Sequence, residues 1–164
     1  MTAVRDDDRI LQEVADALRA RFGDAVLGTA SAKDGLIVRL DPSVLRAALL
    51  FLKEEQGFNA LLDIIALDRL KTAPAGPRFE ILYQLYRFPA GQRLRLSIEA
   101  AEGREIDSAQ PVFKSADWAE REAYDMFGIR FAGHPDLRRI YLPDEFEGFP
   151  LRKDFPLEGT KRGL

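Results

Sequence analysis

The stretch SADWAEREAYDMFG, residues 115–128, separates an upstream part with helical and strand patterns from a downstream part interrupted by prolines and glycines. It predicts a short helix over 115–127 that stops at Gly128, with Asp117 as a candidate N-cap and Glu120 three residues later. Projected at about 100° per residue, small and apolar side chains fall on one side of this helix and charged groups on the other. The apolar side holds Ala119, Ala123, Met126 and Phe127, and the polar side holds Trp118, Arg121, Glu122 and Asp125.

The two sides of this helix predict two different environments. The apolar side can bury into a domain, while the other side presents a tryptophan among charges, with Arg121 and Asp125 at a spacing that allows an ion pair. Trp and Arg are enriched at the energetic centres of interfaces. A solvated helix face on which Trp118 lies flat against the domain is the plain alternative, since single exposed apolar residues are common.

Upstream of this helix, helical and strand patterns alternate. The first predicted helix follows three aspartates, repeats apolar residues at helical spacing and stops at Gly23. The second begins with Asp41 as N-cap and Pro42 at its first position. We therefore predict an α+β fold, with helices on one face of a mainly antiparallel sheet. The helices are expected over 6–22 and 42–57, and the strands over 26–30, 36–40, 60–70, 79–88 and 94–100.

Downstream, residues 131–164 have a different character. Their four prolines and four glycines exclude a long helix or a central strand. Their eleven large apolar side chains are too many for a typical disordered segment. We therefore expect an α+β domain over 1–130 that includes the short helix, followed by an extended arm over 131–164 that is ordered on a partner.

Composition excludes several classes of function. At 164 residues and 46% apolar content the chain fits one domain with its own core. A net charge of -3 with both signs interspersed argues against a nucleic-acid partner. The N-terminus lacks the pattern of a secretory signal, and no apolar run approaches the roughly 20 residues that cross a bilayer. We expect a cytoplasmic protein that meets a membrane only through partners.

Redox and metal chemistry have few candidate groups in this chain. It has no cysteine and one histidine, His134, so thiolate-bound clusters and typical haem or zinc sites are not expected. A carboxylate site for a hard cation remains open. Glu120 and Glu122 point about 200° apart on a helix and cannot share a substrate. His134-Pro135 predicts a turn in which the imidazole bonds a backbone carbonyl, rather than a catalytic base.

The stretch WAEREAYDMFGIRFAGHPDLRRI, residues 118–140, resembles the signature of the 30-kilodalton subunit family of respiratory complex I, which includes the C subunit of bacterial NADH:quinone oxidoreductase. The likeness continues through Pro143-Asp144 and through residues 148–157. It implies a non-catalytic member of the peripheral arm that binds no cofactor and docks on the quinone-site subunit, known as the D subunit, among other peripheral-arm subunits. The complex as a whole would use NADH, FMN, iron–sulfur clusters and quinone at the cytoplasmic side of the bacterial cell membrane.

The resemblance also implies which residues dock. Arginines suit bidentate pairing with carboxylates on a neighbour, so we expect Arg138, Arg139 and Arg152 to act mainly through partner carboxylates and to matter little for the stability of the domain. The complete set of expected interface residues is Trp118, Glu120, Arg121, Glu122, Tyr124, Asp125, Phe127, Gly128, His134, Pro135, Arg138, Arg139, Pro150, Arg152, Lys153 and Asp154.

Two other functions remain open at this point. The same module occurs in energy-converting hydrogenases and in F420- or ferredoxin-type dehydrogenases, which the residues separate poorly from the NADH complex. An independent hydrolase or isomerase would need a convergent set of Asp, Glu and Arg side chains that the sequence does not assemble. We expect no catalytic activity from the isolated chain.

Overall fold

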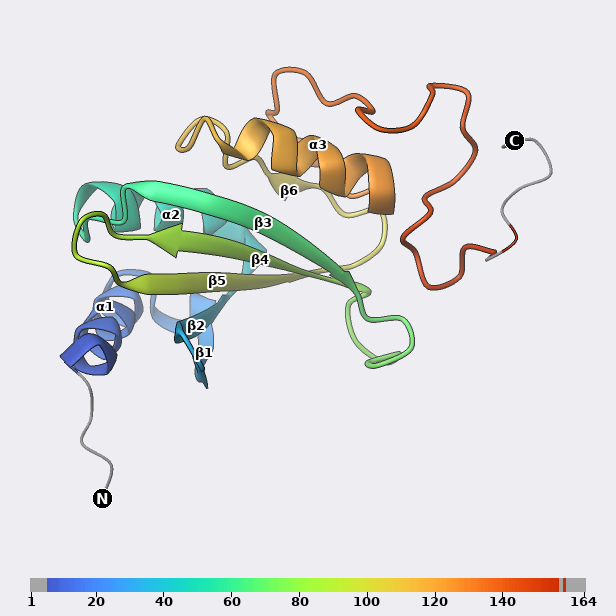
Figure 1. Ribbon diagram of the computed structural model, residues 1–164. Helices are drawn as coiled ribbons and strands as arrows, with labels where there is room; N and C mark the ends of the chain where they lie inside the picture. Colours follow the sequence, from blue (N-terminus) through green and yellow to red (C-terminus); the bar gives the residue numbers. More distant parts are fainter. Residues whose placement is uncertain (1–5, 157, 159–164) are drawn as a thin grey trace.

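The computed structural model describes residues 6–156 and 158, and its centre is a five-stranded sheet in the order β1-β2-β5-β4-β3 (Figure 1). Neighbouring strands are antiparallel except β2 and β5, which are parallel. The predicted α+β fold with a mainly antiparallel sheet is confirmed. The strands are β1 (Val26–Ala32), β2 (Gly35–Leu40), β3 (Ala60–Asp68), β4 (Phe79–Tyr86) and β5 (Arg93–Ala100).

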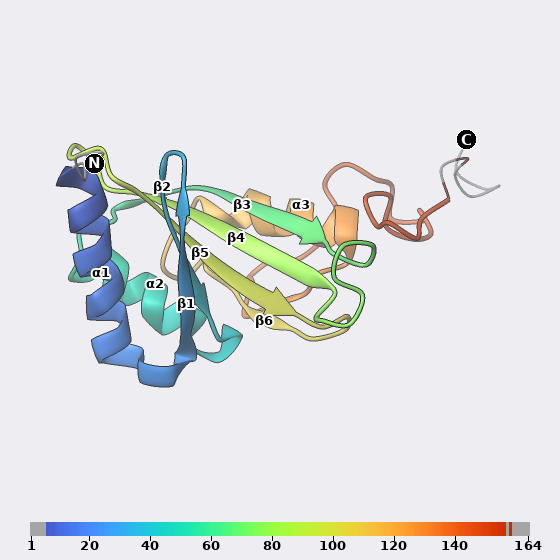
Figure 2. The same cartoon turned by 90° about the horizontal axis from the view of Figure 1, so that it is seen from below.

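In the described part of the chain, three helices and two short ladder strands complete the body. Helix α1 packs along β2, and α3 runs beside the edge strand β3 (Figures 1 and 2). The core gathers the apolar side of α1 and α2 against one face of the sheet. The helices are α1 (Asp6–Phe22), α2 (Leu45–Glu54) and α3 (Ala116–Phe127), with 3-10 turns η1 (Gly23–Ala25) and η2 (Pro42–Val44) and strands β6 (Ile106–Asp107) and β7 (Phe131–Ala132).

One face of the sheet is buried because successive side chains of a strand point to opposite faces. In β4 the odd-numbered residues are buried, while the even-numbered ones are half-exposed on the opposite face. On that second face polar groups meet one another, as where Arg95 donates to Gln84 and pairs with Asp34. Directly opposite residues of β4 and β5 share a face, which places the buried rows of both strands under the helices.

Local chemistry sets the ends of the elements. The side chain of Asp41 accepts a hydrogen bond from the Ser43 N–H at 2.9 Å, as the predicted cap requires, although it opens the 3-10 turn η2 before α2. Helix α2 ends at Glu54 rather than near Gly57. The chain leaves the helix there because Gly57 takes a φ of 71°, and the Phe58 N–H reaches back to the Leu52 carbonyl at 2.9 Å.

A short parallel ladder joins the beginning of the predicted arm to the body. Strands β6 and β7 pair, and the side chain of Phe131 is buried. Residues 133–156 then contain no helix or strand, as the prolines and glycines predict, and the chain leaves the body beside α3 (Figure 1). The proposed order of this arm on a partner stays a prediction.

Candidate docking site

At the start of α3, the residue in the N-cap position is not the one that the sequence predicts, whereas the end of the helix is as predicted. The N-cap position is Ser115, whose hydroxyl donates to the Leu61 carbonyl on β3 at 2.9 Å instead of capping the helix. The prediction of Asp117 as N-cap is wrong, because the helix begins at Ala116 and Asp117 already lies in its first turn. Gly128 ends the helix as predicted, in the left-handed conformation.

Glu120 is fully buried and ties α3 to the segment after β6. One carboxylate oxygen accepts from the Ser108 hydroxyl and the other from the Ala109 N–H, both at 2.6 Å. Burial raises the pKa of Glu120 to about 7, although these two hydrogen bonds and the charge of Arg46 act against it. This carboxyl therefore serves the chain's own packing and not a capping box.

His134 lies next to this carboxyl. Its side chain is completely buried, and Nε2 is 3.2 Å from the carbonyl oxygen of Asp117 and 3.9 Å from a carboxylate oxygen of Glu120. The other ring nitrogen accepts from the Asp136 N–H at 3.1 Å. The predicted turn with an imidazole bonded to a backbone carbonyl is confirmed, and it fastens the beginning of the arm to α3.

Asp125 is the second point at which α3 holds the arm. Its Oδ2 accepts from the N–H groups of three consecutive arm residues, Ile140, Tyr141 and Leu142, at 2.8 to 3.1 Å. Its Oδ1 pairs with Arg139 Nη1 at 2.8 Å. Burial alone would raise the pKa of Asp125, but these hydrogen bonds outweigh it and hold that pKa below its ordinary value.

Arg121 does not form the expected ion pair with Asp125, which pairs with Arg139. Arg121 instead stacks on the Trp118 ring at 4.8 Å and donates to the carbonyl oxygens of Arg138 and Arg139. Arg121 and Asp125 are buried because the arm folds over this side of α3, an arrangement that helical periodicity cannot reveal. The predicted polar side of the helix is thus only partly exposed.

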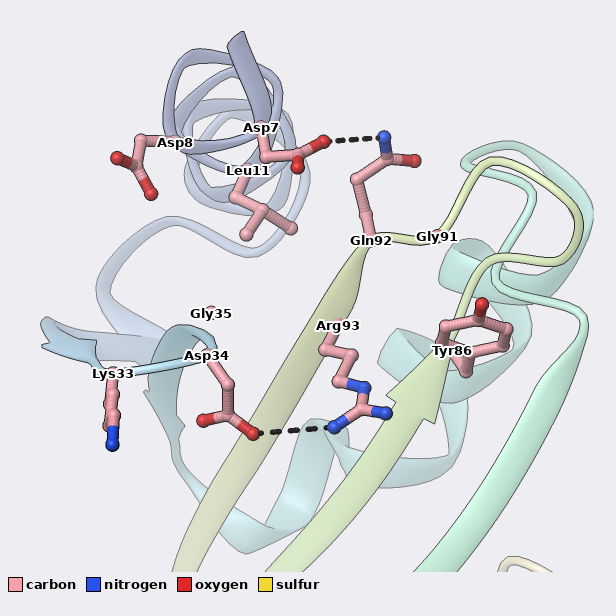
Figure 3. A pocket seen from close by; sticks show the side chains of 10 residues that line it. All are labelled: Asp7, Asp8, Leu11, Lys33, Asp34, Gly35, Tyr86, Gly91, Gln92 and Arg93. Carbon is pink, nitrogen blue, oxygen red and sulfur yellow. Dashed lines mark hydrogen bonds and ion pairs between the residues drawn. The ribbon is translucent and has the colours of Figure 1, made fainter. Parts of the chain in front are cut away.

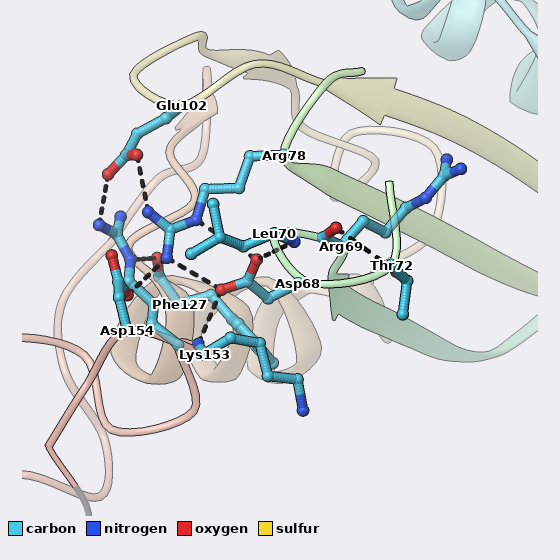
Figure 4. A network of polar contacts seen from close by, with 10 residues as sticks. Asp68, Arg69, Leu70, Thr72, Arg78, Glu102, Phe127, Lys153 and Asp154 are labelled. Carbon is cyan, nitrogen blue, oxygen red and sulfur yellow. Dashed lines mark hydrogen bonds and ion pairs between the residues drawn. The ribbon is translucent and has the colours of Figure 1, made fainter. Parts of the chain in front are cut away.

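The third anchor is a charge cluster at the far end of the sheet (Figure 4). Arg78 lies between Asp68 at the end of β3, Glu102 after β5, and Asp154 in the arm, with separations of 2.9, 2.8 and 2.6 Å. The Lys153 N–H donates to the same Asp68 carboxylate at 2.9 Å. Hydrogen bonds from Arg78 lower the pKa of Asp154 and of Glu102.

Arg152 joins this cluster to the end of α3. It pairs with Glu102 at 2.5 Å and donates to the Phe127 carbonyl at 2.6 Å. The ring of Phe149 lies 4.5 Å from its guanidinium carbon. Both Arg139 and Arg152 therefore have partners inside the chain, which the sequence did not predict, so their replacement is expected to affect the fold itself.

The structure thus separates the predicted docking residues into two groups. The buried or half-buried ones are Glu120, Arg121, Tyr124, Asp125, Phe127, Gly128, His134, Arg139, Pro150 and Arg152. The exposed ones are Trp118, Glu122, Pro135, Arg138, Lys153 and Asp154.

Four exposed side chains form what we call the aromatic patch: Trp118, Glu122, Arg138 and Tyr141. Trp118 is 64% exposed and Tyr141 is 65% exposed, and the Tyr141 hydroxyl lies 3.4 Å from the Glu122 carboxylate. The backbone of Arg138 is linked to Trp118 through Arg121. Sequence reasoning placed Tyr141 among the apolar arm residues but not among the docking residues, because its position beside α3 depends on the arm's path.

A separate hollow of about 320 Å³ lies between the start of α1 and the start of β5 (Figure 3). Two of its acidic groups have partners within the chain, since Asp7 accepts from Gln92 at 2.8 Å and Asp34 pairs with Arg93 at 3.6 Å. Across residues 6–156 and 158, no group of three His, Asp or Glu side chains could hold a metal ion. No helix of that same part is long and apolar enough to span a bilayer.

Fold and site together define an α+β chain whose third helix is covered by the arm that follows it. The chain belongs to the family described as the 30 Kd subunit of respiratory-chain NADH dehydrogenase, which matches residues 38–161. Within that family it is of the type formed by the C subunits of NADH-quinone oxidoreductase, which lie in the peripheral arm of complex I.

Individual relatives agree with this assignment. The C 2 subunit of NADH-quinone oxidoreductase from Rhizobium etli is 48% identical, over 88% of this chain and 76% of the relative. The corresponding C subunit from Trichlorobacter lovleyi is 43% identical, over 90% of each chain. Among solved structures, a trypsin-resistant fragment of Nqo5 aligns with a TM-score of 0.69 and 31% identity, over 78% of this chain and 99% of the fragment.

A more distant structure shares only the fold. A chain of an archaeal membrane-bound sulfane sulfur reductase, a respiratory membrane complex, aligns with a TM-score of 0.73 at 21% identity, over 89% of this chain and 85% of that chain.

Proposed function

We propose that this chain is a non-catalytic structural subunit that docks on the quinone-site subunit, the D subunit of the complex, through the aromatic patch. Electron transfer is then carried by other subunits. The observation that carries the proposal is the exposure of Trp118 and Tyr141 on a surface whose surroundings are internally bonded. Aromatic and arginine side chains with that exposure are typical centres of protein interfaces.

The internal bonds make the patch suitable for docking. Asp125 binds the backbone of Tyr141, and Arg121 binds the backbone of Arg138, so the arm presents its side chains from a held position. A surface ordered before binding loses less conformational entropy on association. The buried members of the predicted docking set would then support the interface indirectly.

We propose that the chain holds no cofactor, while the NADH, FMN, iron–sulfur clusters and quinone of the complex lie in other subunits. We also place it at the cytoplasmic side of the bacterial membrane through its partners. We further propose that an α+β unit over 1–130 is followed by a partner-binding arm over 131–164. The trypsin resistance named for the Nqo5 fragment, which covers 78% of this chain, is consistent with a stable unit shorter than the whole chain.

The alternative complexes are less well supported. The archaeal sulfane sulfur reductase chain shows that the fold occurs outside NADH complexes, but its likeness extends to the fold alone. The relatives named as C subunits of NADH-quinone oxidoreductase match at 43% and 48% identity, which favours the NADH–quinone complex.

The test measures binding of the purified full chain to the purified quinone-site subunit. Trp118→Ala and Tyr141→Ala should each weaken binding by about 30-fold or more, the effect of an interface centre worth about 2 kcal/mol. Leu27→Ala is the matched control, because Leu27 is 63% exposed on the opposite edge strand. Failure of the unaltered chain to bind, or unchanged binding by both aromatic variants, would overturn the proposal.

A further inference from the structure

A groove lies between the edge strand β3 and helix α3, next to the aromatic patch. Its apolar lining includes Ile65 and Ala66 from β3, Phe127 from α3, and Leu151 from the arm. The Leu151 N–H donates to the Met126 carbonyl at 3.2 Å, which brings this arm residue to the end of α3. We call this feature the β3–α3 groove, and it unites three segments that are distant in sequence.

The size of the groove suits a single large side chain. Its volume is about 190 Å³. For comparison, an apolar cavity of about 150 Å³ in another protein accepts a benzene ring. Leu151 is 50% exposed at this groove, so a large apolar surface remains in contact with water in the free chain. An aromatic or leucine side chain would therefore remove apolar area from water on both sides of the contact.

The rim of the groove is acidic. Asp63 and Glu122 are both exposed and both line it. Their contacts are with uncharged groups: Asp63 accepts from the Ile64 N–H at 2.8 Å, and Glu122 accepts from the Tyr141 hydroxyl at 3.4 Å. No ion pair of either carboxylate occurs within residues 6–156 and 158. A Lys or Arg of a partner placed at this rim would neutralise these two carboxylates.

We propose that the β3–α3 groove receives one large apolar side chain from a segment of the partner subunit, and that a neighbouring Lys or Arg of that segment pairs with Asp63 and Glu122. This inference rests on the proposed docking function and extends it to a second contact, since Glu122 belongs to both surfaces. A second copy of this chain fits less well. A two-fold contact between copies at this groove would place two acidic rims against each other.

The first experiment uses the cysteine-free sequence, in which one introduced thiol can be followed alone. Leu151→Cys in the full chain should react freely with a maleimide reagent and become protected, by at least 10-fold in rate, when the purified quinone-site subunit binds. Leu27→Cys, on the opposite edge, should react equally with and without that partner. Protection of Leu151→Cys by the chain alone at high concentration would identify a second copy as the occupant and overturn the inference.

The second experiment separates the acidic rim from the apolar groove. Asp63→Lys should weaken binding by about 10-fold or more at low salt and make affinity less dependent on salt. Leu151→Ala should weaken binding at every salt concentration while leaving the salt dependence unchanged. Glu55→Lys is the control, since this exposed carboxylate lies beyond α2. If Asp63→Lys does not fold, Asp63→Asn removes the charge and keeps an oxygen for the Ile64 N–H.

The outcomes distinguish the two proposals. If the unaltered chain does not bind the quinone-site subunit, the proposed function fails. If it binds, and the Asp63 and Leu151 variants bind equally well with Leu151→Cys unprotected, only the groove inference fails.

Discussion

Asp125 and Arg139 form an ion pair 2.8 Å long between helix α3 and the arm that follows it, with the carboxylate fully buried. The second oxygen of Asp125 receives three consecutive backbone N–H groups of the arm. The two partners are 14 positions apart in the sequence. The pair therefore belongs to the tertiary structure of this chain, and it positions the aromatic patch.

The first prediction concerns Asp125. Asp125→Ala should lower the free energy of unfolding by about 3–5 kcal/mol, because it leaves a buried arginine and three N–H groups without their acceptor. Denaturant unfolding measures this loss. Hydrogen exchange should accelerate at residues 140–142 and much less in β4 and β5. An unchanged midpoint would show that the arm is held by other contacts.

The loss of stability at acidic pH should also depend on the carboxylate of Asp125. The pKa of Asp125 is lower in the folded chain than in the unfolded chain, so its stabilising contribution is present above the unfolded pKa, about 3.9, and is lost as pH falls through the folded pKa. Asp125→Asn removes this titration. Below pH 4 the stability of that variant should therefore fall less steeply than that of the unaltered chain.

A second prediction compares two neighbouring arginines. Arg139 has a side chain only 13% exposed and paired with buried Asp125, whereas Arg138 is 69% exposed and pairs with Asp136 at the surface. Arg139→Ala should cost about 3–5 kcal/mol of stability, and Arg138→Ala about 0–1 kcal/mol. Calorimetry on both variants makes the comparison. Equal effects on melting would contradict the distinct roles that we assign to them.

A third prediction follows from the buried carboxyl of Glu120. Its pKa rises from 4.5 to about 7 on folding, so the folded chain holds this proton more tightly. The stabilising contribution of the protonated group is complete below pH 4.5 and is lost as pH rises toward 7, by roughly 3 kcal/mol. Glu120→Gln cannot titrate. Its free energy of unfolding should therefore change less between pH 5 and 7 than that of the unaltered chain, and parallel profiles would refute this account.

A fourth prediction uses two glycines with positive φ. At Gly128 a Cβ atom would lie 2.6 Å from the Phe149 ring and 2.7 Å from the Arg152 guanidinium, whereas at Gly91 nothing lies within 4 Å. Both substitutions to alanine carry a backbone cost of about 1–2 kcal/mol. Gly128→Ala should cost more, because the arm must also move away from α3. Thermal unfolding of the two variants measures the difference, which should vanish if the arm is not packed there.

A fifth prediction concerns cofactors. The purified chain should carry neither flavin nor stoichiometric iron, because it has no cysteine and only one histidine. Its NADH and quinone turnover should be at background. Absorbance spectroscopy and metal analysis of the purified chain test this, and a bound redox group that survives purification would contradict it.

The sequence by itself determined the local elements and the family signature. The cap at Asp41, the helix stop at Gly128 and the turn at His134 were all predictable, because each depends on residues close together in the chain. The strand predicted over 79–88 likewise contains β4, Phe79–Tyr86. These features follow from backbone geometry and short-range hydrogen bonding.

Only the tertiary structure decided which charged residues are buried within the chain and which stay exposed. Helical periodicity placed Arg121 and Asp125 on an exposed side, but a later segment without regular structure covers that side and pairs with it. The same long-range folding placed Arg78 beside Asp154, which are 76 positions apart. The parallel pairing of β2 with β5 also could not be predicted from the sequence. A side chain's burial depends on every segment that packs against it, and residue spacing encodes only the nearest of these.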